Sequence, residues 1–499
     1  MGLTTAMLLG HHGVSSLSAE RHAGTAIHPR AGHFHLRTME ILRQVGLEDT
    51  ARKASLAMYH PNGGINAVES LAGREIAVFI ADLNQGVEGF SPTVRVMLNQ
   101  DVLEPILRDK ASELGAELVN RTEVASLEQD DEGVTSVLRD LDSGEERTVR
   151  SRYVVAADGN RSPTRERLGI GMEGYGQLSR SITIYFRADC APLLEGRNQG
   201  VIYVHNAELR GFFRLDRSGG TGFLVVNTVG EDVTTEEAVD VGAGLTPERT
   251  AEMLRIAIGA DIPVELLDVA HWVAEANCAT SFQKGRVFLA GDAAHVVPPN
   301  GGFGGNTGVL DAHNLAWKLA AVVKGEAGPA LLDTYDAERR PQGRMVVEQA
   351  YARYATRVVP ERGTDDVEPL IDDLSIEIGG VLHSPAVLSE PDEDGAIHQL
   401  PSETRGRPGT RAPHVPLAGG STLDLLGDGF VVLTGPDGDG WTAPGVQTHV
   451  IAADGFLDAY GIGAGGASLV CPDGIVAWRS PGPPDPGALA GAIDAVLAR

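Results

Sequence analysis

The stretch RVFLAGDAAHVVPPNGGFGGNTGVLDAHNLAWKLA, residues 286–320, decides the fold. It opens with a short apolar run that is typical of a buried strand, and Gly291 and Asp292 follow that run. A diproline and a glycine-rich loop come next, and an apolar helix is predicted from Asn306 to about Lys324. This order predicts an α/β domain in which backbone amides at the helix start face an electron-rich ligand.

A second acid follows another predicted strand. The run YVVAAD, residues 153–158, ends on Asp158, and Gly159 follows it. An acid beside a glycine at the mouth of a sheet can accept hydrogen bonds from sugar or ribityl hydroxyls. The preceding segment, from Glu117 to Val155, alternates in polarity and predicts an antiparallel insertion that returns to a parallel sheet.

The first residues fit the end of a dinucleotide-binding fingerprint. An apolar helix is predicted from Leu3 to Gly13 and a short strand follows it. Gly2 directly precedes the helix, and Glu20 lies at the end of the next strand, where an acid accepts ribose hydroxyls. A buried helix that begins with glycine and a solvated Glu20–Arg21 pair would explain the same residues.

Composition excludes several classes of protein. The 499 residues include 41 Lys and Arg against 68 Asp and Glu, for a net charge of −27, so we expect no nucleic-acid partner and no membrane partner. Cys190, Cys278 and Cys471 lie far apart without a C-x-x-C pair, which indicates no disulfide framework and fits a cytoplasmic setting. No run approaches the ~18 apolar residues that span a bilayer, and no spacing predicts a metal site.

The chain changes character several times along its length. Residues 179–227 are rich in aromatic and β-branched residues and predict a separate sheet, and residues 401–416 are rich in proline and glycine and predict a linker. The predicted parts are a first domain (1–170, with part of the sheet domain near 60–98), a sheet domain (171–275), a return to the first domain with its long helix (276–355), a helical connector (356–400), the linker (401–416) and a small α/β domain (417–499).

On the Asp158 and Asp292 segments, the chain resembles the class A flavoprotein monooxygenases of the para-hydroxybenzoate hydroxylase superfamily, and within it the polyketide-tailoring hydroxylases. The resemblance covers residues 1 to about 354, and LVCPDGIVAWRS, residues 469–480, extends it to a thioredoxin-like C-terminal domain. It implies a Rossmann-like FAD-binding domain interleaved with a mainly antiparallel substrate domain. Because the C-terminal domain offers only Cys471, we expect no redox activity there.

The resemblance also assigns the cofactor site. It places Arg30 against FAD and the nicotinamide, Gln100 near the ribityl chain, Asp158 in FAD and nicotinamide binding, and Asp292 on the ribityl and ribose hydroxyls. The adenosine end is implied for Gly2, Glu20 and Arg21, and the loop that lines the isoalloxazine is implied for Pro298, Gly301, Gly302 and Asn306.

The activity implied by the resemblance is hydroxylation of an aromatic or polycyclic, polyketide-type substrate. FAD, NADPH or NADH, and dioxygen would take part through a flavin C4a-hydroperoxide. Tyr185, Tyr203, His205 and Arg214 lie on the predicted substrate sheet as candidates to assist the phenol, and ordinary packing competes as an explanation for each. The sequence leaves open whether the protein forms a homodimer.

Other functions compete with hydroxylation. Baeyer–Villiger or epoxidising oxygenation fits the same fold, and a truncated, non-catalytic binding protein and a plain nicotinamide dehydrogenase are further alternatives. The first strand and first two glycines of the fingerprint are expected about a dozen residues before Met1. We interpret Met1 as an internal GTG valine codon that was read as the start.

Overall fold

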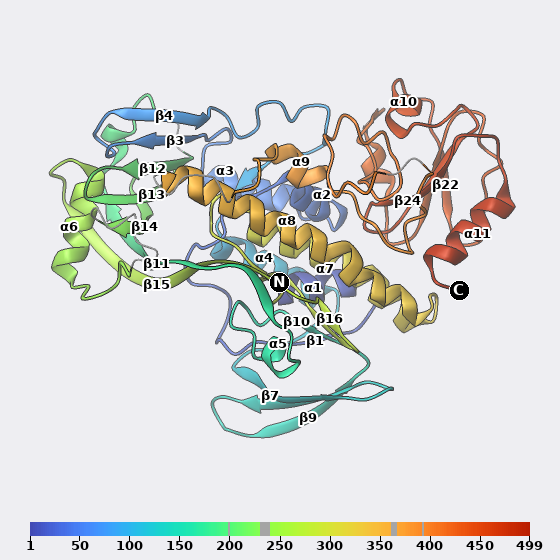
Figure 1. Ribbon diagram of the computed structural model, residues 1–499, viewed down its shortest axis with the longest axis horizontal. Helices are drawn as coiled ribbons and strands as arrows, with labels where there is room; N and C mark the ends of the chain where they lie inside the picture. Colours follow the sequence, from blue (N-terminus) through green and yellow to red (C-terminus); the bar gives the residue numbers. More distant parts are fainter. Residues whose placement is uncertain (198–199, 230–239, 361–366, 392–393) are drawn as a thin grey trace.

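The computed structural model describes residues 1–499 apart from 198–199, 230–239, 361–366 and 392–393. It has a helix-rich central part, a large curved sheet at one end and a smaller α/β domain at the other (Figure 1). Most strands of the large sheet come between α5 (Pro163–Arg167) and β16 (Gln283–Lys284), and two earlier strands and one later strand also belong to it. The predicted α/β class with interleaved domains is therefore confirmed.

The central part contains short strands that pair in parallel. The predicted first helix and strand are α1 (Gly2–His11) and β1 (Leu17–Ala19), and β1 pairs in parallel with β6 (Glu117–Val119). Next, β10 (Val154–Ala156) pairs in parallel with β17 (Val287–Leu289), so the strands that precede the two predicted acids are neighbours. The other elements here are β2 (His33–Phe34), α2 (Leu36–Gln44), α3 (Glu48–Met58), β5 (Val96–Met97) and α4 (Gln100–Glu113), and the antiparallel insertion is β7 (Thr122–Gln129), β8 (Val134–Asp140) and β9 (Glu146–Ser151).

Two long helices close the central part. Helix α7 (Phe303–Lys324) begins three residues earlier than predicted, because Gly302 adopts a left-handed conformation with φ 70° that turns the chain directly into the helix. It ends at Gly325, which is also left-handed. Helix α8 (Thr334–Arg357) packs against α7 and against the long strands of the sheet, and it crosses the middle of the molecule (Figure 1).

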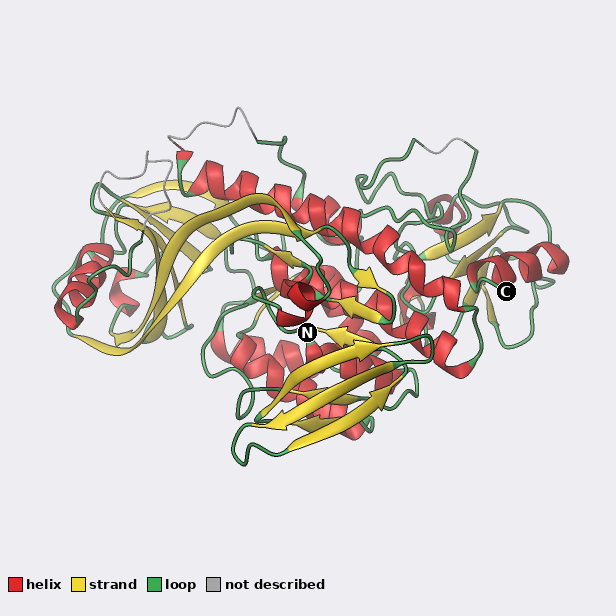
Figure 2. Cartoon of the chain, turned by 60° about the horizontal axis from the view of Figure 1, so that its bottom comes forward, coloured by secondary structure: helices red, strands yellow, loops and turns green. Residues whose placement is uncertain are grey.

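The large sheet has eight strands in the order β18-β15-β11-β14-β13-β12-β3-β4. Strands β11 and β15 are long and curved (Figure 2). The strands predicted between residues 179 and 227 are present, and the sheet extends beyond them on both sides. The bounds are β3 (Ile65–Val68), β4 (Glu75–Ile80), β11 (Met172–Ala188), β12 (Val201–His205), β13 (Leu209–Leu215), β14 (Thr221–Val229), β15 (Val264–Ala279) and β18 (His295–Val296).

One face of this sheet packs against helix α6 (Pro247–Ile258). Successive side chains along a strand alternate between the two faces of the sheet, and on β13 Phe213 belongs to the core with α6. The residues before and after it, Phe212 and Arg214, therefore point to the opposite face. Phe212 lies across from Tyr203 in the register of β12 and β13, so Tyr203 shares that second face.

The C-terminal domain contains a four-stranded sheet in the order β22-β21-β23-β24, in which only the β21–β22 pair is parallel. It contacts the central part through buried polar groups, and Asn314 on α7 donates to Asp473 at 3.0 Å. The bounds are α9 (Asp373–Ile378), β19 (Pro416–Leu417), β20 (Gly420–Ser421), β21 (Val431–Thr434), β22 (Gln447–Val450), α10 (Phe456–Tyr460), β23 (Ala467–Val470), β24 (Val476–Ser480) and α11 (Pro486–Val496). Among the described residues, no helix is long and apolar enough to cross a membrane.

Candidate active site

The loop before α7 is fixed to the N-terminal segment by Asn306. The side chain of Asn306 accepts hydrogen bonds from the His35 amide at 2.9 Å and from the Thr38 hydroxyl at 2.7 Å. Its amide group donates to the carbonyls of His33 at 2.9 Å and Gly302 at 2.7 Å. Asn306 is buried, so these four bonds lock the glycine loop against residues 33–38.

The glycines of this loop leave room that side chains would fill. Gly301 and Gly302 have φ values of 100° and 70°, which side chains other than glycine rarely adopt. A Cβ at Gly302 would lie 3.4 Å from His33. Helix α7 also has no side-chain cap and no acid in its first turn, so its first amides can receive an electron-rich ligand. The loop and helix start therefore suit the edge of a flavin ring.

Asp292 lies in a 3-10 turn (Gly291–Ala293) and not at the end of β17 as predicted, because Gly291 with φ 62° turns the chain out of the strand. Asp292 is exposed. Hydrogen bonds to side chains of two helices hold the rest of the turn. The Gly291 amide donates to Asp311 on α7 at 3.1 Å, and Arg165 on α5 donates to the Ala293 carbonyl at 3.0 Å. The turn is rigid while its acid stays available to a ligand.

Asp311 is the centre of a buried polar group that sequence reasoning missed. It is fully buried, and its carboxylate accepts from His295 at 2.6 Å and from Arg339 at 2.9 Å, besides the Gly291 amide. Burial acts to raise the pKa of Asp311, but His295 and Arg339 outweigh that effect and hold the pKa below its ordinary value. Asp311 therefore supports the Asp292 turn as an anion.

Asp158 follows β10 by two residues, so the strand ends earlier than predicted. Its carboxylate accepts from the Ser162 hydroxyl at 2.5 Å and from the Thr164 amide at 3.0 Å, which fixes the start of α5. Because β10 and β17 are adjacent and parallel, Asp158 and Asp292 leave the same edge of the sheet. The structure thus brings these two predicted acids to one side.

The segment after β1 runs along α4. Gln100 accepts from the Ala31 amide at 3.4 Å and donates to Glu104 at 2.6 Å, and Glu104 also accepts from the Ala26 amide at 2.5 Å. Arg30, between these contacts, is exposed. Gln100 therefore lies beside the backbone next to Arg30, and the cofactor roles that the resemblance implies for both residues stay predictions.

The adenosine-end residues gather around the first residue. Burial lowers the pKa of the Met1 amino group, and the charges of Glu104, Asp292 and Glu20 act against this shift. Glu20 accepts from the His22 amide at 2.8 Å, and Arg21 is exposed. A Cβ on Gly2 would lie 3.6 Å from the Ser18 hydroxyl, which is an ordinary contact, so the surrounding protein does not itself require glycine at this position. Gly2 and Glu20 lie on the Asp292 side of the site.

Two of the candidates on the sheet reach the central part. Asn300, in the glycine loop, donates to the Tyr203 hydroxyl at 3.2 Å, and the Asn300 carbonyl oxygen is buried without a partner in the described chain. Arg214 donates to the Gly32 carbonyl at 2.7 Å. Sequence reasoning missed Asn300, although its place directly before Gly301 was a usable signal.

The other candidates lie farther from the loop. His205 is half-buried with its ring centroid 6.2 Å from that of Tyr203. Tyr185 stacks on His28 with 4.5 Å between centroids, and His28 pairs with Asp268 at 2.8 Å. Burial raises the pKa of Tyr185 to about 12, so its hydroxyl stays protonated near neutral pH.

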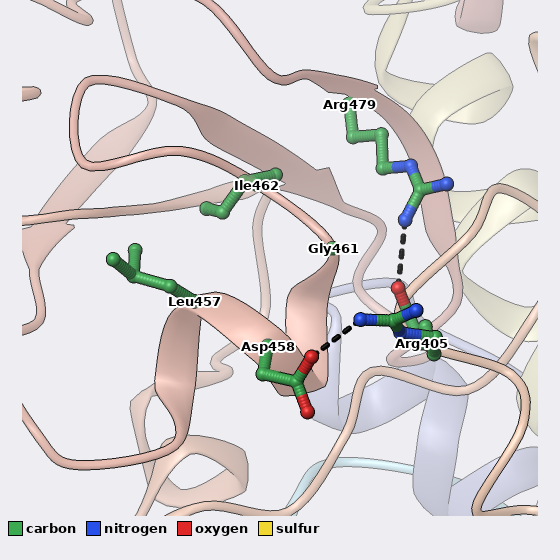
Figure 3. Close-up of a pocket in the computed structure, with 6 residues that line it drawn as sticks. All are labelled: Arg405, Leu457, Asp458, Gly461, Ile462 and Arg479. Atoms are coloured by element: carbon green, nitrogen blue, oxygen red, sulfur yellow. Dashed lines mark hydrogen bonds and ion pairs between the residues drawn. The ribbon is translucent and has the colours of Figure 1, made fainter.

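A surface hollow of about 510 Å³ in the C-terminal domain is separate from these residues (Figure 3). Its charged groups already have partners, because Arg405 is paired with Asp458 and Arg479 donates to the Arg405 carbonyl at 2.7 Å. Arg479 also makes two bonds to Glu390. We assign no ligand to this hollow.

The comparisons with known proteins agree with this geometry. Residues 1–350 match the FAD binding domain family, and residues 405–499 match the aromatic-ring hydroxylase C-terminal domain. The chain therefore belongs to the FAD-dependent aromatic-ring hydroxylases.

Individual relatives cover the whole chain. It is 55% identical to the 4-methyl-5-nitrocatechol 5-monooxygenase of a Burkholderia species, over 100% of this chain and 96% of the relative. It is 38% identical to the tetracenomycin A2 monooxygenase-dioxygenase of Streptomyces glaucescens, over 100% and 95%. A crystal structure of aklavinone-11 hydroxylase with FAD and aklavinone superposes with a TM-score of 0.91 at 35% identity, over 100% and 97%.

The protein is an FAD-dependent monooxygenase that hydroxylates aromatic substrates, with NAD(P)H as reductant. The flavin supplies the oxygen activation when it is bound. In this chain the start of α7 has no side-chain cap, so its first amides would be available to the ring edge, and Asn300 of the glycine loop contacts Tyr203 on the second face of the large sheet.

Proposed function

We propose that the substrate is a single-ring catechol, hydroxylated on the ring. The observation that carries this proposal is the 55% identity to the nitrocatechol monooxygenase, against 38% for the tetracenomycin enzyme. Closely spaced rings on the second face of the sheet support it, since the rings of Tyr203 and Phe212 are 5.7 Å apart and those of Phe212 and Phe223 are 6.4 Å apart. These rings form an apolar wall for one aromatic ring.

Within this site we assign Tyr203 to the substrate hydroxyl. Asn300 donates to the Tyr203 oxygen, which leaves the Tyr203 proton free to point away from the loop. A phenol that donates to the substrate oxygen, or exchanges a proton with it, would favour the phenolate that the hydroxylation needs. Arg30, Gln100, Asp158 and Asp292 would hold the cofactor as the resemblance implies, and a cytoplasmic location fits three cysteines that are all free and buried.

The test is turnover by the purified protein with its FAD. NADH and NADPH oxidation would be recorded with 4-methyl-5-nitrocatechol, catechol and a polycyclic phenol such as aklavinone, and each product would be identified by mass and ring connectivity. We expect the highest kcat/KM with the nitrocatechol, with the new oxygen either at a ring C–H as an added hydroxyl or at the nitro-bearing carbon, where nitrite is released and a quinone forms. A lactone would establish Baeyer–Villiger chemistry instead, and a preparation without flavin would establish a non-catalytic protein.

A polycyclic substrate is the second candidate. The close superposition on aklavinone-11 hydroxylase, which was solved with aklavinone bound, favours it. The same panel separates the two, because a polycyclic preference would appear as a higher kcat/KM for the polycyclic phenol than for either catechol.

A further inference from the structure

Arg214 is a buried cation on which the charge of Asp101 acts without an ion pair forming between them. Only 5% of the residue is exposed, and it makes no ion pair with a carboxylate in the part of the chain that the structure describes. Within the described ranges, its one hydrogen bond is donated to the Gly32 carbonyl, and its Nε group is buried with no partner there. The guanidinium therefore has unused donors inside the protein.

The surroundings hold this side chain in one place. A Cβ at Gly32 would fall 1.4 Å from a terminal nitrogen of Arg214, so only glycine at this position allows the contact. The guanidinium also lies over the Tyr59 ring, 4.6 Å from its centroid, and the Tyr59 hydroxyl donates to Asn99 at 2.7 Å. The contacts with Gly32 and Tyr59 therefore fix the position of the Arg214 guanidinium.

An unpaired buried charge destabilises a fold unless a ligand completes it. Burial lowers the pKa of Arg214 below its ordinary value, and an arginine nevertheless stays charged near neutral pH. Nε2 of His33 is also buried without a partner among the described residues, and the charge of Arg214 contributes to the lowered pKa of His33. The unused guanidinium donors of Arg214 are suited to an oxyanion.

We infer that Arg214 binds the ionised hydroxyl of the substrate and selects phenolates over neutral phenols. This inference rests on the proposed catechol site, because Arg214 shares the second face of the sheet with Tyr203 and Phe212. A nitro group on a catechol lowers the pKa of the ring hydroxyls, so a nitrocatechol reaches this arginine as an anion near neutral pH. The other oxyanion that could lie here is one carried by the flavin, and the test separates the two.

The main experiment measures binding to the oxidised holoenzyme without reductant. Dissociation constants for 4-methyl-5-nitrocatechol and for unsubstituted catechol would be determined by calorimetry for the wild type and for Arg214→Met. Loss of a charge-assisted hydrogen bond predicts a roughly 10- to 100-fold weaker binding of the nitrocatechol. We expect less than about a threefold change for catechol, which gains little from a cation.

The pH dependence gives a second signature. In the wild type, KM for the nitrocatechol should rise as the pH falls below the pKa of the substrate hydroxyl, and in Arg214→Met it should hardly depend on pH. Arg214→Lys retains the charge and should recover part of the affinity for the nitrocatechol, which also covers the case in which Arg214→Met does not fold.

Arg411 provides the matched control, since it is also buried but lies 3.5 Å from Glu40. Arg411→Met should lower Tm and leave the affinity for nitrocatechol unchanged, whereas Arg214→Met should leave Tm unchanged or raise it. Equal losses for both catechols, or a matching loss of FAD affinity, would overturn the inference in favour of a flavin oxyanion or a structural role. A wild type that turns over neither catechol would instead contradict the proposed function.

Discussion

The two faces of the large sheet differ in what they contact. The face toward α6 consists of apolar side chains, among them Phe186, Phe213 and Leu224, all fully buried. The face toward the glycine loop mixes aromatic rings with polar groups, and Tyr203 and Arg214 reach across it to Asn300 and Gly32. Because side chains alternate along each strand, the sheet has one apolar face and one face that carries polar groups.

The difference shows in the polar atoms. On the α6 face the packed side chains of this cluster are apolar, and the buried Oδ1 of Asn66, which lies in register with Ile202, is an unpartnered neutral atom in the described chain. On the loop face, Arg214 Nε and the Asn300 carbonyl oxygen are buried without partners in the described chain. Buried polar groups are normally paired, and the loop face differs in that its unpartnered groups include a charged guanidinium, which an anionic ligand can complete.

The largest effect is expected on the α6 face. Phe213→Ala removes a fully buried ring that packs edge to face on Phe186 at 5.8 Å, and should lower the free energy of unfolding by about 3–5 kcal/mol. Denaturant unfolding would measure this, with KM of the folded enzyme near the wild-type value. Leu267→Ala, on β15 but 44% exposed, is the control and should change stability by less than about 0.5 kcal/mol. Similar losses for both variants would contradict the assignment of the faces.

The opposite pattern is expected for Tyr203→Phe. The ring keeps its packing, and only the hydroxyl that accepts from Asn300 is lost. Loss of proton-transfer assistance predicts a kcat lower by about 100-fold, with stability changed by about 1 kcal/mol or less. Steady-state kinetics and thermal unfolding of the same preparation would test it. A kcat within a few-fold of the wild type would remove Tyr203 from the chemistry.

A third prediction concerns Asp311, which accepts a hydrogen bond from the turn that carries Asp292. Asp311→Asn keeps the shape of the side chain but cannot accept from His295, Arg339 and Gly291 together. The Asp292 turn should loosen, and FAD should bind roughly 10- to 100-fold more weakly. Fluorescence titration of the apoprotein with FAD measures this.

The control for Asp311→Asn is on the same helix. Lys318→Met breaks another buried ion pair, with Glu338 at 2.6 Å, and should lower Tm without changing FAD affinity. The Asp292→Asn/Asp311→Asn double variant should bind FAD about as weakly as Asp292→Asn alone. Additive losses would show that Asp311 does not act through Asp292.

The smallest effect on the two faces of the sheet is expected from lowering the pH. Burial lowers the pKa of His33 and of His35 below the ordinary value of 6.5, with Arg95 and Arg214 lowering that of His33 further and Glu377 partly opposing the shift for His35. Both are neutral in the folded protein, so their contribution is complete above about pH 6.5 and is lost as the pH falls below it, by at most about 1.4 kcal/mol per unit and group. FAD release should therefore precede unfolding of the α6 side on acidification. Simultaneous loss of both signals would contradict this order.

The sequence by itself determined the local secondary structure around the glycine loop. Residues 286–320 predicted the strand, the glycine loop and the long helix, because apolar periodicity and glycine report burial and backbone conformation within a few residues. The helix start was misplaced by three residues, since Gly302 could act as a cap only once its left-handed conformation was known. The strand alternation likewise predicted a sheet, but not which face would meet the loop.

The tertiary structure alone decided the pairings. Asn300 meets Tyr203 across 97 positions and Arg214 meets Gly32 across 182, and Asp311 takes its partners from β18, α8 and the Asp292 turn. No local pattern encodes such contacts, because they arise only when the sheet, the glycine loop and α8 pack together. The sequence supplied the chemical groups, and packing over long separations brought them to one site.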